Sequence, residues 1–365
     1  MHRGMTAAAN PARPDLGMIE GRFGRLWTPA ERGHVVATLA GAGYSFYHYG
    51  PKGDRALRRD WRVAHDAVQA DALARLSAEV RGAGMRFGLA LTPDGSTHPF
   101  DDAARADLTR RIADLDAIGI DDLAILFDDL RGDMPDLAAR QADVVNFCAA
   151  ATRATRVYTC PTYYSDDPVL DMVFTPRPAD YLGDLGRRLD PAIRVYWTGE
   201  EVCPKEIGPA HLARVGGELG RPVCLWDNWP VNDGARMSRF LHLRAFTGRP
   251  AANAAHLSGH AINPAIQAHL GCIPALTLPM VYDQGADYAY GAAFAAAAER
   301  LLGQPFAHML QQDLIALQDT GHERLGTRAA KLRDRYAPID HPAAREIIRW
   351  LDGADLMTDA EVQTQ

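Results

Sequence analysis

Short apolar runs alternate with longer helix-like stretches along most of the chain. Eight such runs, rich in apolar and β-branched residues, occur between residues 16 and 264, and each gives way to polar positions. They span residues 16–21, 44–52, 85–93, 123–129, 156–164, 193–201, 222–233 and 256–264. Runs of this kind, without strict alternation, are typical of strands buried on both faces of a parallel sheet.

The stretches between the runs are long enough to be helices. In the first of them Thr28 and Glu31 have the spacing of a capping box, Pro29 occupies the first helical position, and glycines end the pattern. Eight strand–helix units predict a (β/α)8 TIM barrel of the α/β class. A doubly wound sheet is the main alternative, but it should carry a phosphate loop after an early strand. Neither G-x-G-x-x-G nor G-x-x-x-x-G-K-[ST] occurs in the chain.

Three further stretches predict helices beyond the barrel. They are amphipathic or alanine-rich, and glycine stands at each predicted end: residues 290–303, 306–321 and 341–353. We therefore expect a disordered N-terminal segment over 1–14, a catalytic barrel over 15–285 and a C-terminal helical region over 286–365. These helices are a candidate surface for a homodimer.

Composition and charge narrow the class of protein. The net charge of -7 argues against a phosphate-backbone binder, so no nucleic-acid partner is expected. The five cysteines form no C-x-x-C pair, and the histidines show no H-E-x-x-H spacing, which predicts neither a metal nor another cofactor. The N-terminus lacks a secretion signal and no apolar run reaches 18 residues, so we expect a cytoplasmic protein without a membrane partner.

Candidate chemistry follows the predicted strands, because the active site of a barrel lies at the C-terminal ends of its strands. The side chains found there are carboxylates, a lysine, amides and aromatic rings, which together suit a neutral polyol. They are Glu20, Gly21, Lys52, Asp94, Asp128, Asp129, Tyr164, Thr198, Glu200, Trp226, Asn228, Asp233 and Asn263.

The adjacent carboxylates of Asp128 and Asp129 allow two interpretations. They could be a pair of catalytic acids, or a solvated loop in which one aspartate caps the next helix. Other acidic pairs, at 101–102 and 121–122, lie in helical or pre-strand contexts and are expected to be solvated. Three tryptophans are expected in the core: Trp61, Trp197 and Trp350.

Several motifs, in order along the chain, resemble those of glycoside hydrolase family 84, the β-N-acetylglucosaminidases that remove O-linked GlcNAc from proteins. They are "MIEGRFGRLWTPAER", "GPKGDRALRRDWR", "LFDDL", "CPTYY", "YWTGEEVCPKEI", "LWDNWPVND" and "AINP". The chain departs from the family pattern at Arg22 and Phe23, which replace an aromatic residue and a tyrosine, and at Ala265, which replaces an asparagine.

The resemblance implies a role for each matching position. Asp128 would orient and polarise the 2-acetamido group of the substrate, and Asp129 would be the general acid/base. The implied substrate-binding residues are Gly21, Lys52, Tyr164, Trp226, Asn228, Asp233 and Asn263. Adjacent aspartates on a strand point to opposite faces and cannot straddle one bond, but in substrate-assisted catalysis the acetamido oxygen is itself the nucleophile.

The leading interpretation is therefore a cofactor-free, retaining exo-β-N-acetylglucosaminidase that acts through an oxazoline on a GlcNAc-bearing glycoprotein or glycan. Three alternatives stay open at this point. They are a catalytically weak GlcNAc-binding barrel, a β-N-acetylhexosaminidase that acts on cell-wall or glycan fragments, and a metal-dependent barrel hydrolase.

Overall fold

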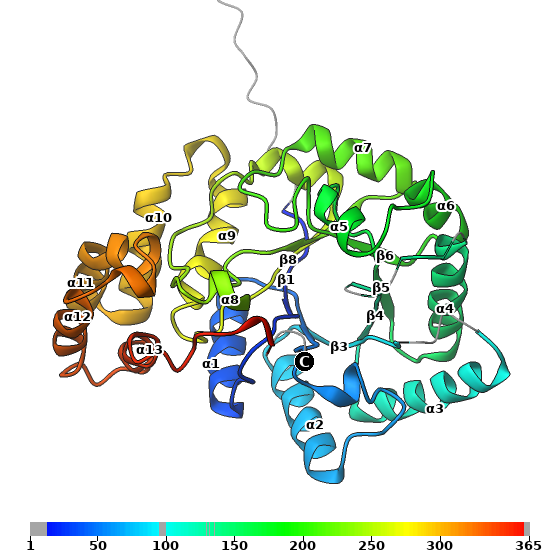
Figure 1. Cartoon of the computed structure of the whole chain (residues 1–365), viewed down its shortest axis with the longest axis horizontal. Helices are drawn as coiled ribbons and strands as arrows, with labels where there is room; N and C mark the ends of the chain where they lie inside the picture. Colours follow the sequence, from blue (N-terminus) through cyan, green and yellow to red (C-terminus); the bar gives the residue numbers. More distant parts are fainter. Residues whose placement is uncertain (1–12, 95–99, 129, 131, 135, 361–365) are drawn as a thin grey trace, which may run out of the picture.

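The chain folds into a closed barrel of eight parallel strands in sequential order, which confirms the predicted (β/α)8 class (Figure 1). The computed structural model describes residues 13–94, 100–128, 130, 132–134 and 136–360. Pairing of β1 with both β2 and β8 closes the barrel. The strands are β1 Leu16–Glu20, β2 Phe46–Tyr49, β3 Arg86–Leu91, β4 Asp122–Leu126, β5 Arg156–Cys160, β6 Arg194–Trp197, β7 Val223–Asp227 and β8 Leu257–Ile262.

Each predicted apolar run covers one of these strands and extends beyond it, except that β4 begins at Asp122, one residue before its run. The strands are almost wholly buried, because helices cover their outer faces and side chains fill the interior. The runs are longer than the strands because several loops that leave the barrel are buried as well. Those loops carry most of the candidate chemistry.

Helices surround the barrel, and the first begins as the sequence predicts. Thr28 accepts a hydrogen bond from the backbone of Glu31, and the Glu31 side chain completes the capping box before α1 (Pro29–Ala40). The connection from β7 to β8 differs, since it holds only the short α8 (Gly234–Met237) and a 3-10 turn at Ala251–His256. The others around the barrel are α2 Ala67–Gly82, α3 Asp102–Ile118, α4 Leu137–Ala151, α5 Pro168–Val173, α6 Tyr181–Arg188, α7 Pro209–Leu219 and α9 Cys272–Gln284.

The C-terminal helices pack beside the barrel on a second apolar core (Figure 1). They are α10 Tyr290–Leu302, α11 Gln304–Leu314, α12 Arg328–Tyr336 and α13 Pro342–Leu351. The sequence analysis missed α12, because its only buried side chains are Leu332 and Tyr336. Part of this second core comes from α9 and from residues 241–245, so the helices share their core with segments of the barrel. Their use as a dimer surface stays a prediction.

Two expectations about individual side chains have different outcomes. The three tryptophans assigned to the core are fully buried. The expectation that Asp122 is solvated is wrong: it lies in β4, is fully buried, and forms ion pairs with His48 and Arg86. Burial alone would raise the pKa of Asp122, but these two partners hold it below the usual range. Its acidic neighbour Asp121 immediately precedes β4 and is half-buried, with its Oδ2 accepting the backbone N–H of Phe87 at 3.0 Å.

The predicted N-terminal segment falls mostly outside the described residues, since the description begins at residue 13. Within the described ranges, no helix has both the length and the apolar character needed to cross a bilayer.

Candidate active site

A small cavity of about 130 Å³ opens where the barrel strands end. Every described residue that the sequence analysis assigned to catalysis or substrate binding lines it: Gly21, Lys52, Asp128, Tyr164, Trp226, Asn228, Asp233 and Asn263. Asp129, the assigned general acid/base, lies outside the described residues. The lining also includes Thr198, a strand-end candidate for which the resemblance implied no role, and five residues that the sequence analysis had not placed there: Phe23, Cys160, Val202, Cys203 and Val231.

The two-residue period of the strands explains how these side chains meet. Successive residues of a strand point to opposite faces, so residues spaced by two share the barrel interior. Trp226 and Asn228 therefore point inward from the end of β7, whereas Asp227 between them pairs with Arg249 outside. The same period turns Cys160, the last residue of β5, toward the interior, and Tyr164 joins it from the loop that follows the strand. This period was a signal in the sequence that could have identified Cys160 as a site residue.

Asp128 and Lys52 form a buried ion pair across the cavity. The Lys52 ammonium donates to Oδ2 of Asp128 and also lies 5.9 Å from the centroid of the Trp226 ring. Both charged side chains are almost fully excluded from solvent. Oδ1 of Asp128 is buried and has no hydrogen-bond partner among the described residues. A buried carboxylate oxygen without a donor is costly, which makes this atom a candidate acceptor for a ligand N–H or O–H.

A chain of hydrogen bonds fixes the side of the cavity formed by β7, β8 and β1. Nδ2 of Asn263 donates to Oδ1 of Asn228 at 3.0 Å, and the same oxygen accepts the Trp226 indole N–H at 3.1 Å. Asn228 in turn donates to the carbonyl of Val202 at 2.7 Å. The backbone N–H of Gly21 donates to Oδ1 of Asn263 at 3.3 Å. These polar groups are therefore oriented before any ligand binds.

The edge of the Trp226 indole packs closely against Gly21. A Cβ atom at residue 21 would lie 2.2 Å from Cζ2 of Trp226, which is far inside the contact distance of two carbons. Only glycine leaves room for the indole at this place. The ring consequently forms a wall of the cavity whose position is set by backbone rather than by a movable side chain.

Asp233 is held by the loop that follows β1. Its Oδ2 accepts the backbone N–H of Phe23 at 2.8 Å, across 210 residues of sequence. Arg22, which departs from the family pattern, does not point into the cavity lining but is buried and donates to the carbonyls of Phe23 and Arg25. Burial lowers the pKa of Arg22. The arginine therefore acts as an internal clamp for this loop.

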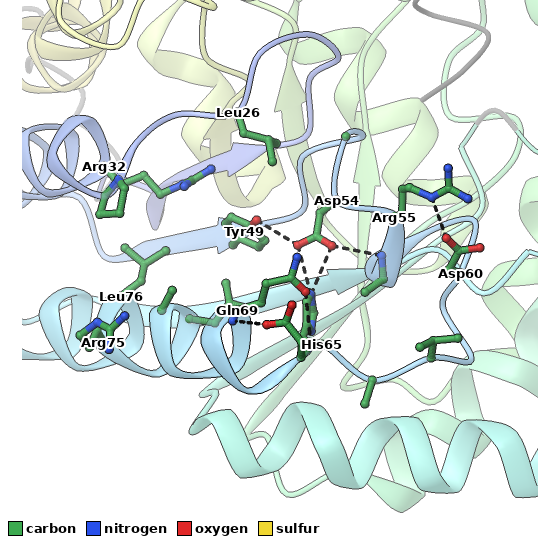
Figure 2. A pocket seen from close by; sticks show the side chains of 18 of the residues that line it. Leu26, Arg32, Tyr49, Asp54, Arg55, Asp60, His65, Gln69, Arg75 and Leu76 are labelled. Carbon is green, nitrogen blue, oxygen red and sulfur yellow. Dashed lines mark hydrogen bonds and ion pairs between the residues drawn. The ribbon is translucent and has the colours of Figure 1, made fainter.

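The loop that carries Lys52 is fastened by a second carboxylate, the half-buried Asp54, at the edge of a larger outer cavity of about 630 Å³ (Figure 2). Asp54 accepts the Tyr49 hydroxyl at 2.9 Å, the ring Nε2 of His65 at 3.1 Å and the backbone N–H of Ala56 at 3.1 Å. Burial would raise the pKa of Asp54, but the bonds to His65, Tyr49 and Ala56 together outweigh this effect and lower it.

Three acidic candidates from the sequence do not reach the cavity. Glu20 points outward to α1, where both of its oxygens bind the Arg32 guanidinium at 2.8–2.9 Å. Asp94 and Glu200 are exposed and absent from the lining. Ala265 is buried outside the lining as well. Among the described residues, no group of three or more histidine, cysteine or acidic side chains could hold a metal ion.

Carboxylates beside amides and an aromatic wall, gathered at the open end of a TIM barrel, are typical of enzymes that cleave sugar linkages. Fold and cavity thus define the class as a glycoside hydrolase. Comparison with protein families agrees: the family model described as beta-N-acetylglucosaminidase matches residues 16–317. The chain therefore belongs to the β-N-acetylglucosaminidase family, glycoside hydrolase family 84.

Individual relatives are consistent with this assignment. Protein O-GlcNAcase of Rattus norvegicus is 29% identical over 271 residues, and that of Mus musculus is 28% identical over 272. Each alignment covers 71% of this chain, which spans 29% of the length of these relatives. The solved structure of an aspartate-to-asparagine mutant of Thermobaculum terrenum O-GlcNAc hydrolase matches with a TM-score of 0.77 and 25% identity. That match covers 92% of this chain and 80% of the other.

Proposed function

We propose that this protein is a retaining exo-β-N-acetylglucosaminidase that removes terminal β-linked GlcNAc by substrate-assisted catalysis. The observation that carries the proposal is Oδ1 of Asp128, which is buried and has no hydrogen-bond partner among the described residues, in a cavity where Asn228, Asp233 and Asn263 already have theirs. An acetamido N–H would supply the donor that this oxygen lacks. The cavity is small, which suits one terminal sugar rather than the interior of a polysaccharide.

The roles follow from the chemistry of the groups. The acetamido carbonyl oxygen would attack C1 of the sugar while the glycosidic bond breaks, which gives an oxazoline. Asp128 would accept the acetamido N–H and balance the positive charge that develops on that group, as Lys52 keeps its carboxylate in place. Asp129 would protonate the leaving oxygen and then deprotonate the water that opens the oxazoline, with net retention.

The remaining side chains would bind the sugar. Tyr164 and Asn228 would hold the acetamido group and the oxazoline, and Trp226 would pack against the sugar as a wall of the cavity. Asp233 would accept hydrogen bonds from the hydroxyls on the far side of the ring. Gly21 and Asn263 complete this surface at the ends of β1 and β8. The substrate proposed on this basis is a GlcNAc-bearing glycoprotein or glycan in the cytoplasm.

Release of nitrophenol from its β-N-acetylglucosaminide, with and without a chelator, tests the reaction. We expect release that the chelator does not change. Loss of activity under chelator would favour a metal-dependent hydrolase, and no release at all would favour a GlcNAc-binding barrel. A panel of glycopeptides, muropeptides and short oligosaccharides at matched concentration would then define the acceptor.

Two substitutions separate the roles of the adjacent aspartates. Asp129→Asn should damage hydrolysis of glycosides with poor leaving groups far more than that of activated aryl glycosides, since general acid catalysis contributes on the order of 10²–10⁴-fold. Asp128→Asn should impair both substrates alike, because both need the acetamido group. Equal losses on both substrates in the Asp129 variant would contradict its role as the acid.

A further inference from the structure

The segment after α13 runs back from the C-terminal helices to the barrel, where it ends beside the strand ends (red in Figure 1). Two of its side chains are buried although the segment is not part of a long helix: Asp355 is 4% exposed and Met357 is 8% exposed. Both contact loops that line the small cavity at the strand ends. Neither side chain lines the cavity itself.

Met357 fills the space between the loop after β1 and the loop after β7. Its Sδ accepts the backbone N–H of Gly234 at 3.4 Å. On the other side it abuts Gly24, where an added Cβ would lie 3.0 Å from the same sulfur. Gly234 directly follows Asp233, and Gly24 directly follows Phe23, whose N–H binds Asp233. Met357 therefore packs against both parts of the Asp233–Phe23 contact.

Asp355 reaches the other side of Asp233 through two amides. Its Oδ2 accepts from Nε2 of Gln267 at 3.1 Å, and Oε1 of Gln267 accepts from Nδ2 of Asn232 at 2.9 Å. Asn232 and Gln267 are both buried. Because Asn232 immediately precedes Asp233, these bonds are a second connection to Asp233. This connection does not involve Met357.

The segment is itself held to the barrel at Ser238, just after α8. The backbone N–H of Met357 donates to the Ser238 hydroxyl at 3.0 Å, and the Trp350 indole N–H donates to the Ser238 carbonyl at 3.0 Å. Arg349 also donates to Oδ1 of Asp355 at 2.9 Å. Because these bonds hold the segment at two places, its side chains have defined positions and can in turn hold the loops that they contact.

We propose that the segment Asp355–Met357 positions Asp233, and that Met357 is a positioning residue for sugar binding. The proposal rests on the function proposed above, in which Asp233 binds the far-side hydroxyls. These hydroxyls do not react, so their hydrogen bonds contribute similarly to the ground state and the transition state. Loss of the correct position of Asp233 should therefore raise KM and leave kcat nearly unchanged.

The kinetic test uses the full chain and a nitrophenyl β-N-acetylglucosaminide. Met357→Ala should raise KM about fivefold or more with kcat within about twofold, which is the pattern for lost uniform binding. Met357→Leu keeps most of the volume and should restore KM. In the double variant Asp233→Asn/Met357→Ala, KM should equal that of Asp233→Asn alone, because coupled residues are not additive. Leu332→Ala, an equally buried truncation in α12, should lower Tm without changing KM.

Hydrogen–deuterium exchange tests the same coupling without any ligand. Exchange over residues 231–237 should rise in Met357→Ala and stay at the wild-type level in Leu332→Ala. Unchanged exchange and KM in Met357→Ala would overturn the proposal, and so would a KM effect that adds to that of Asp233→Asn. An inactive wild-type protein would instead overturn the proposed function, and the exchange measurement would then decide the positioning role alone.

Discussion

The contact between Gly21 and Trp226 allows a steric prediction. In Gly21→Ala the new Cβ would lie 2.2 Å from Cζ2 and 2.5 Å from Cη2 of the indole. Because two carbons are in contact at about 3.5 Å, the edge of the ring must retreat by about 1.3 Å. This movement would also stretch the 3.1 Å bond from the indole N–H to Asn228. Misplacement of about 1 Å costs on the order of 10²-fold, so kcat/KM should fall about 100-fold.

The assay is hydrolysis of a nitrophenyl β-N-acetylglucosaminide, with Tm measured on the same preparations. Gly217→Ala is the matched control, since no atom lies within 4 Å of its added Cβ in α7. This control should keep full activity and gain about 0.5–1 kcal/mol of stability. A folded Gly21→Ala variant with wild-type kcat/KM would refute the conclusion that backbone contact sets the position of Trp226.

Three further predictions concern buried ionisable side chains. Lys52→Met removes the partner of Asp128 and should lower kcat/KM on the order of 10²-fold, because the carboxylate loses its orientation. Arg249→Met leaves the buried carboxylate of Asp227 without its bidentate partner, and urea unfolding should show a loss of about 3–5 kcal/mol. Burial lowers the pKa of His242 to about 4, so its folded form is neutral. The stability that this residue contributes should be complete above pH ~6.5 and fall by up to about 3 kcal/mol as pH drops to 4. Unfolding curves of the wild type and His242→Asn across this range would measure that difference.

Each of these predictions has an outcome that contradicts it. Lys331→Met removes an exposed lysine of α12, and equal activity of this control and Lys52→Met would count against the orienting role of Lys52. An Arg249→Met variant as stable as the wild type would show that the remaining partner, His260, satisfies Asp227 by itself. Parallel pH profiles for the wild type and His242→Asn would mean that other groups cause the acid loss of stability.

The strands and most of the candidate site could both be predicted from the sequence, because both depend on local patterns along the chain. Buried strands require continuous apolar runs, and the barrel requires each run to end at the same mouth, so residues after the runs had to converge. Lys52 and Asn263 are 211 residues apart in the sequence, yet each lies at or next to the end of its run and both line the cavity. The two-residue period would also have placed Cys160 there, had it been applied beyond the polar residues.

Side chains whose role depends on a distant partner were not predictable in this way. Asp122 looks like half of a solvated acidic pair, but ion pairs with His48 of β2 and Arg86 of β3 compensate for its burial. Glu20 lies at a strand end like the site residues, yet its carboxylate points outward and pairs with Arg32 of α1. A local pattern says whether a position is buried, but it does not name the group that faces it.

The sequence by itself therefore determined the barrel, its polar mouth and most of the polar residues that line the cavity, since each follows from periodicity and from motifs within one strand–loop unit. Tertiary structure alone decided what holds those residues in place. The Phe23 backbone binds Asp233, and Met357 packs against Gly24 and Gly234. Such contacts join segments more than 100 residues apart, and they exist only because barrel closure and the C-terminal helices bring those segments together.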